Sequence, residues 1–140
     1  MRKGLHIVAR AVGPALIATG SATAAHAQVV SPMEQTVDAA GPRAVAQFTV
    51  ANPYPLAQHS EFFVVGDDGT PVAGAKLLPH RRTLAPNARA RLTVSVPLDG
   101  LPERRVYVCH AIEPRYATLV AGGTSYRGEV CSKLVARSRG

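Results

Sequence analysis

The stretch ARARLTVSV (residues 88–96) alternates strictly between apolar and polar side chains. Its apolar members run from Ala88 to Val96 at every second position, and its polar members include Arg89 and Arg91. Successive side chains of a β-strand point to opposite faces, so this period of two is typical of a strand that is half buried. The stretch therefore predicts a sheet with one face on a core and the other face in water.

Similar segments lie on both sides of this stretch, and turn residues separate them. Residues 43–52 alternate in the same way and end at Pro53-Tyr54-Pro55. Residues 61–65 form a compact apolar run that ends in Gly66-Asp67-Asp68-Gly69, a typical turn sequence. The remaining candidate strands are residues 29–37, 76–84, 104–112 and 127–135.

Short strands at regular spacing predict an all-β fold. Helical periodicity is not sustained anywhere after residue 27, and the chain has 11 prolines, 12 glycines and no tryptophan. About seven such strands are typical of an immunoglobulin-like β-sandwich. A small closed barrel is the alternative architecture.

The first 27 residues have the features of a secretory signal peptide. Arg2 and Lys3 supply positive charge, residues 5–17 are largely apolar, and Ala25-His26-Ala27 has the small side chains that signal peptidase requires. The apolar stretch is shorter than the roughly 20 residues of a membrane-spanning helix, and Arg10 interrupts it. We therefore expect cleavage after residue 27, no stable membrane span afterwards, and a periplasmic or secreted protein.

Removal of this segment leaves residues 28–140, which is enough for one domain. The formal charge falls from +7 to +4, because three basic residues leave with the signal peptide. The remaining arginines either attract an acidic partner or protect exposed strands from aggregation, and Arg89 and Arg91 fit the second explanation. Because no aromatic residues are interleaved with them, nucleic acid is not an expected partner.

The two cysteines, Cys109 and Cys131, lie in the last two candidate strands. In an exported protein such a pair normally forms a disulfide, and without Cys-x-x-Cys spacing we expect it to be structural. If the strands form an antiparallel hairpin with the cysteines opposite each other, the whole register is determined. That register pairs Val106 with Leu134, Val108 with Ser132 and Glu113 with Arg127, and the expected core residues of the hairpin are Val106, Val108, Ile112, Val130 and Leu134.

We predict no catalytic, metal or cofactor site. The serines lack a Gly-x-Ser-x-Gly context, and Asp67-Asp68 is explained by its turn. His110 follows Cys109, but a blue-copper site would also need a methionine ligand after them, and the only methionine beyond the signal peptide is Met33. The sequence therefore favours a binding or structural protein over an enzyme.

Four short stretches follow one another in a recognisable order. They are Val30-Ser31-Pro32, residues 48–52, residues 84–89, and residues 101–104 leading to Val106–Ile112 and Pro114. This order resembles the N-terminal immunoglobulin-like domain of the periplasmic chaperones of chaperone–usher pilus assembly, the PapD-like family. The resemblance covers most of residues 28–140 and implies a protein partner such as a pilin-like subunit.

In that family the last strand of the first domain completes the fold of a subunit by strand addition. The resemblance implies that Val130, Leu134 and Ala136 contact the partner, and that Lys133 helps to hold the subunit's terminal carboxylate. Val130 and Leu134 cannot serve both a partner and the core of this domain unless the hairpin projects beyond the sandwich. The alternative function is a structural or adhesive module of the cell envelope without chaperone activity.

Overall fold

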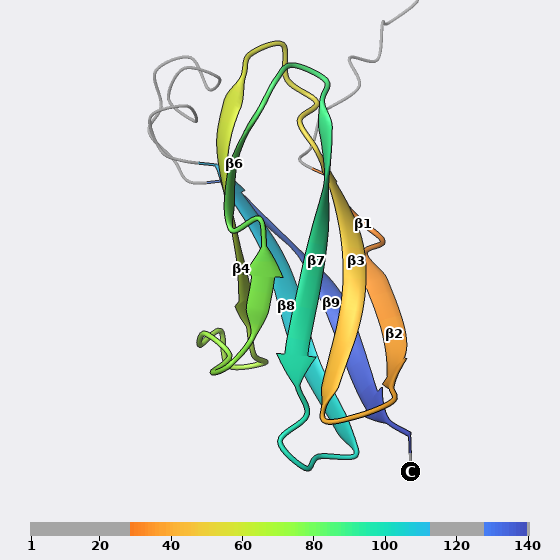
Figure 1. The fold of residues 1–140 in the computed structure, drawn as a ribbon. Helices are drawn as coiled ribbons and strands as arrows, with labels where there is room; N and C mark the ends of the chain where they lie inside the picture. The colour runs from red at the N-terminus through yellow and green to blue at the C-terminus, as the bar shows by residue number, and fades with distance from the viewer. Residues whose placement is uncertain (1–28, 113–127, 140) are drawn as a thin grey trace, which may run out of the picture.

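A computed structural model describes residues 29–112 and 128–139, which fold into two packed β-sheets (Figure 1). Within these ranges no helix is long and apolar enough to cross a membrane. The expected signal peptide lies outside the described residues. The described strands are β1 (Val29–Ser31), β2 (Glu34–Ala39), β3 (Arg43–Ala51), β4 (Gln58–Val65), β5 (Lys76–Leu78), β6 (Arg81–Leu84), β7 (Arg89–Pro97), β8 (Glu103–Ile112) and β9 (Glu129–Ser138).

The predicted all-β sandwich is confirmed, but the described residues form nine strands rather than about seven. Two predicted segments, 29–37 and 76–84, each divide into two strands. Pro32 separates β1 from β2, and Pro79 lies between β5 and β6. Proline has no N–H to donate, so it interrupts a hydrogen-bonded ladder. At each interruption the chain leaves the four-stranded sheet and joins the five-stranded one.

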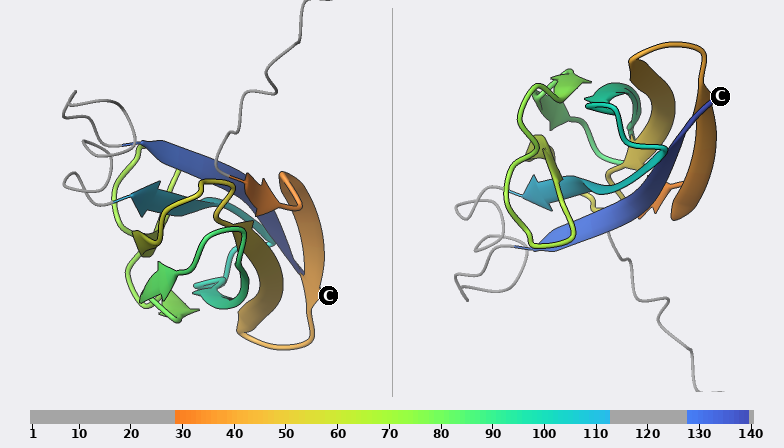
Figure 2. Two further views of the ribbon diagram at one scale, coloured as in Figure 1. Left: turned by 90° about the horizontal axis from the view of Figure 1, so that it is seen from above. Right: turned by 90° about the horizontal axis from the view of Figure 1, so that it is seen from below.

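The strands are ordered β1-β3-β7-β5 in one sheet and β2-β9-β8-β4-β6 in the other. The two sheets lie face to face, as the views from above and below show (Figure 2). Pairing between neighbours is antiparallel, except that β2 runs parallel to β9. The two edge strands of the five-stranded sheet, β2 and β6, therefore each follow a strand of the other sheet in the chain.

The core lies between the sheets and follows the alternation that the sequence shows. Buried and exposed side chains alternate along β3, and the even-numbered side chains from Ala90 to Val96 of β7 are buried. A fully buried side chain of this kind contributes about 1.5–3 kcal/mol relative to an exposed one. The principal contributors are Phe48, Val50, Leu92, Val94, Val96, Val106, Val108 and Leu134.

Asn52 joins three segments at one end of the sandwich. Its fully buried side chain donates through Nδ2 to the carbonyl oxygens of Leu56, Leu84 and Ala85, at 2.9, 3.0 and 3.0 Å. Its Oδ1 accepts the N–H of Tyr54 at 3.1 Å. A buried amide with all these bonds satisfied connects the end of β3 to the segments before β4 and β7.

Candidate functional site

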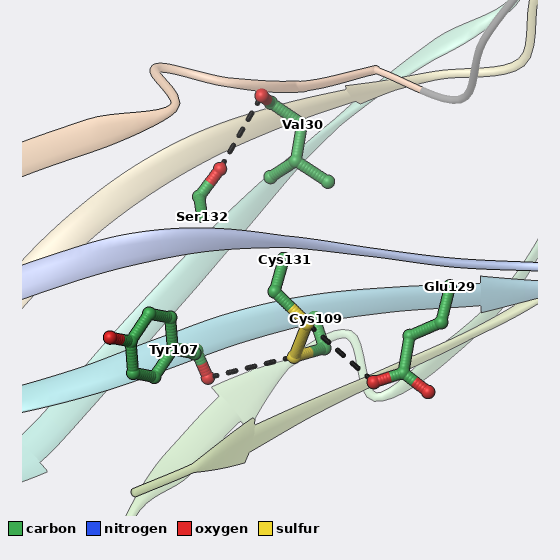
Figure 3. Close-up of a disulfide and its surroundings, with 6 residues drawn as sticks. All are labelled: Val30, Tyr107, Cys109, Glu129, Cys131 and Ser132. Carbon is green, nitrogen blue, oxygen red and sulfur yellow. Dashed lines mark hydrogen bonds between the residues drawn. A yellow bond between two sulfur atoms is a disulfide. The ribbon is translucent and has the colours of Figure 1, made fainter. Parts of the chain in front are cut away.

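Strand β9 is held on one side by β8 and by the disulfide. The two cysteines are opposite each other in the antiparallel ladder, and the S–S distance is 2.08 Å (Figure 3). The predicted pairs Val106–Leu134 and Val108–Ser132 are also confirmed. The predicted pair of Glu113 and Arg127 lies outside the described residues.

On its other side, β9 is paired along only part of its length. The parallel ladder with β2 begins at Lys133 and continues to Ser138, and the Lys133 N–H donates to the carbonyl oxygen of Met33 at 2.9 Å. Backbone groups of alternate residues point to the same side of a strand, so those of Cys131 and Glu129 point the same way as those of Lys133. In residues 29–112 and 128–139, no strand pairs with β9 there before Lys133. We call Glu129–Ser132 the open edge of β9.

The side chains of the open edge lie on two faces. Ser132 is buried, and its Oγ donates to the carbonyl oxygen of Val30 at 3.4 Å, which brings β1 beside the open edge (Figure 3). On the outer face, Oε1 of Glu129 lies 3.5 Å from Sγ of Cys131. Glu129 and the two cysteines are a group of potential metal ligands by position, but sulfurs bonded to each other are not thiolate ligands.

The candidate partner-binding residues do not share one environment. Leu134 and Ala136 are both fully buried within the described domain. Val130 is half-buried at the open edge and packs against the core. The side chains of Leu134 and Ala136 are therefore committed to this domain's own core, as the expected core position of Leu134 requires, and Val130 alone of the three lies at the open edge.

Lys133 forms an ion pair within the domain. Its Nζ lies 3.1 Å from Oε1 of Glu34, which belongs to the paired strand β2. The Lys133 side chain is about one-third exposed and that of Glu34 is mostly exposed. The Lys133 ammonium group, which the resemblance assigns to a partner's carboxylate, is thus already paired with a carboxylate of this domain.

We expect Lys133→Ala to lower the free energy of unfolding by less than about 1 kcal/mol, because exposed ion pairs contribute little. Urea denaturation of Lys133→Ala, Glu34→Ala and the double variant measures the coupling of the pair. A loss of several kcal/mol in Lys133→Ala alone would contradict the view of this pair as an ordinary surface interaction.

His110 forms a buried polar contact that the sequence interpretation missed. Its ring is fully buried, Nε2 lies 2.8 Å from Oγ of Ser60, and the ring centroid is 5.1 Å from that of Phe62. Nδ1 has no hydrogen-bond partner among the described residues. Burial lowers the pKa of His110 to about 4. The sequence feature that indicates this burial is the even-numbered position of His110, which places its side chain on the same face of the strand as Val106 and Val108.

This pKa predicts a loss of stability in mild acid. The pKa of histidine is 6.5 in an unfolded chain and about 4 for His110 in the folded domain. Between these values the unfolded chain binds a proton that the folded chain does not, so stability falls as the pH falls. We expect the free energy of unfolding to be about 2 kcal/mol lower at pH 5 than at pH 7.5.

Urea denaturation at the two pH values measures this loss. His110→Phe should remove most of the pH dependence, while His80→Asn, a change at an exposed histidine, should retain it. If His110→Phe showed the same pH dependence as the unaltered chain, the buried histidine would not be its origin.

No protein-family model matches this chain, and no curated protein sequence matches it significantly. Solved structures do match its fold. The Escherichia coli chaperone DraB is 19% identical, with a TM-score of 0.64 over 80% of this chain and 55% of DraB. A structure of the Salmonella enterica SafA pilin in complex with the SafB chaperone also matches at 19% identity, with a TM-score of 0.62 over 80% of this chain and 54% of that one.

The same fold occurs in a protein that is not named as a chaperone. A PapD-like domain of human CEP192 is 8% identical, with a TM-score of 0.60 over 99% of this chain and 97% of that domain. This chain spans little more than half the length of the two bacterial chaperone structures. At such identities the comparisons establish the architecture. The chain therefore has the PapD-like, immunoglobulin-type β-sandwich fold that these chaperones share with the human domain.

Proposed function

We propose that this chain is an exported, chaperone-like protein that binds a partner subunit by strand pairing at the open edge of β9. One observation supports this above all: β2 reaches only Lys133, so the backbone groups of Glu129 and Cys131 point to a side where no described strand forms a ladder with β9. Strand addition needs such a row of unpaired N–H and C=O groups on a strand held firmly in place. Here β8 and the disulfide hold the strand.

The proposed partner is a pilin-like subunit, by analogy with the SafA pilin in the matching structure with SafB. Val130 would contact the added strand on the inner face, and Lys133 marks the position where β2 closes the edge. Cleavage after residue 27 would release the described domain to the periplasm or the medium. The proposed activity is binding rather than catalysis, as it is for the matching chaperones.

Glu129→Pro should abolish partner binding and leave the domain folded. The N–H of Glu129 points away from β8, so its removal leaves the β8–β9 ladder intact, whereas an added strand would lose one of the two outward N–H donors of the open edge, those of Glu129 and Cys131. The residue before it is Gly128, which tolerates the restriction that proline imposes on its neighbour. Affinity purification of the tagged, secreted chain from the envelope fraction, with mass spectrometry of captured proteins, measures binding.

Glu129→Ala is the matched control, because it removes the same carboxylate and keeps the N–H. The proposal requires that one captured protein is retained by Glu129→Ala and lost by Glu129→Pro at an unchanged thermal midpoint. Equal capture by both variants would refute pairing through this edge.

A structural module of the cell envelope is the second candidate function. The human domain favours it, since this fold exists at nearly full coverage in a protein not named as a chaperone. The burial of Leu134 and Ala136 also leaves few apolar side chains of β9 for a partner. This alternative predicts that no captured protein depends on the Glu129 N–H.

A further inference from the structure

The four-stranded sheet contains no acidic residue. Strands β1, β3, β5 and β7 lack Asp and Glu, although they carry several basic side chains. Every Asp and Glu in residues 29–112 and 128–139 lies in the five-stranded sheet or in the segments around residues 67–68 and 99. The outer face of the four-stranded sheet therefore has a positive potential. Its basic residues are Arg43, Lys76, Arg89 and Arg91.

Two of these arginines are available to bind an anion. Arg89 and Arg91 are exposed, and neither forms an ion pair with any residue that the structure describes. Arg43, by contrast, donates to Oγ of Ser95 at 2.8 Å and to the carbonyl oxygen of Gly74 at 2.8 Å. Arg89 and Arg91 thus retain their full hydrogen-bonding capacity for an external anion.

A pocket of about 300 Å³ adjoins Arg89, and its other lining residues are Ser31, Thr49 and Ala51. Arg91 lies next to it, opposite Thr49 in the β3–β7 ladder. The register explains how the residues meet: Ser31 is opposite Thr49, which is opposite Arg91, and in the next row Ala51 is opposite Arg89. Strand β5 pairs only with residues 93–95 of β7, so the part of β7 that carries Arg89 and Arg91 is an exposed edge. Protecting this edge from aggregation explains why the two residues are charged, but it does not explain why a pocket lies beside them.

The lining matches the chemistry of an oxyanion. Two hydroxyl groups and a guanidinium group can all donate hydrogen bonds to oxygen, and guanidinium binds a carboxylate through two parallel bonds. The side chain of Ala51 is only a methyl group, so it leaves space for a ligand beside the hydroxyl and guanidinium groups. The pocket therefore suits a planar carboxylate better than an apolar or cationic group.

The pocket lies on the same side of the sandwich as the open edge of β9. Ser31 follows Val30, whose carbonyl oxygen accepts the hydrogen bond from Ser132. The Val30 side chain points into the core and Ser31 is exposed. A polypeptide paired at the open edge can thus reach the pocket around β1 without crossing the domain.

We propose that Ser31, Thr49, Arg89 and Arg91 bind an acidic side chain of the partner that pairs with β9. This inference rests on the proposed function and adds a chemical property of the partner: an acidic residue next to the strand that it contributes. Binding at this site adds electrostatic attraction, which is sensitive to salt, to the backbone pairing at the open edge.

The pocket can be tested without the partner, using hexaglutamate as the probe. In NMR titrations of the secreted chain, hexaglutamate should shift the amide signals of the four site residues, and less so at 0.5 M salt. Arg89→Gln combined with Arg91→Gln should weaken binding about tenfold, because two ion pairs are lost. Lys76→Gln, at the far side of the same sheet, is the matched control and should change the affinity less than about twofold.

The outcomes separate this site from the proposed strand pairing. Glu129→Pro should bind hexaglutamate normally even if it loses its partner, because the substitution does not touch the pocket. Equal binding by the double arginine variant would overturn the proposal. It would also be overturned if the arginines were needed for phosphatidylglycerol vesicles while hexaglutamate did not bind, since the ligand would then be a lipid.

Discussion

Leu134→Ala is expected to lower the free energy of unfolding by about 3 kcal/mol, and Val130→Ala by only about 1 kcal/mol. Both residues are on the inner face of β9, four positions apart. Leu134 is fully buried between the sheets, opposite Val106, so truncation leaves a cavity that its packed neighbours cannot fill. Val130 is half-buried at the open edge, where water can replace the missing methyl groups.

Urea denaturation of the two variants at pH 7.5 gives both values, and the m-value shows whether unfolding remains two-state. Because Val130→Ala removes two carbon atoms and Leu134→Ala removes three, Val108→Ala is added as a valine at a fully buried position of β8. We expect Val108→Ala to cost more than Val130→Ala. A cost below about 1 kcal/mol for Leu134→Ala would show that this side chain is available to a partner.

The central strands could be predicted from the sequence because their pattern is local. In β3 and β7 the alternation of side chains directly reports which face is buried, and the structure confirms both strands. The β8–β9 register was also predictable, since placing Cys109 opposite Cys131 determines every other pair. The division of residues 29–37 at Pro32 was not, because proline marks an interruption without showing which sheet each half joins.

The candidate site was harder to predict than the fold. Val130, Leu134 and Ala136 occupy one face of β9, and apolar side chains at every second position look the same whether a core or a partner covers them. The difference depends on where β2 begins to pair with β9, which is a contact across about a hundred residues of chain. The row of Ser31, Thr49 and Arg91 likewise arises from the pairing of three strands that are distant in sequence.

Replacing both cysteines with alanine is expected to lower the free energy of unfolding by about 3 kcal/mol. Cys109 and Cys131 are 22 residues apart, and opening a loop of this size increases the conformational entropy of the unfolded chain. Small domains are stable by only about 5–15 kcal/mol, so the loss is a large fraction of the total. Denaturation of the double variant, compared with the unaltered chain under oxidising conditions, measures it.

The chain-entropy explanation also predicts what the double variant keeps. The β8–β9 backbone ladder does not depend on the sulfurs, so below its thermal midpoint the variant should retain the same fold and the same open edge. The folded variant should therefore capture as much partner as the unaltered chain. Glu129→Pro should also reduce capture by the same amount in both backgrounds. A folded double variant that lost its partner would show instead that the disulfide holds the open edge in its binding conformation, and Cys109 and Cys131 would then belong to the site as well as to the stability of the domain.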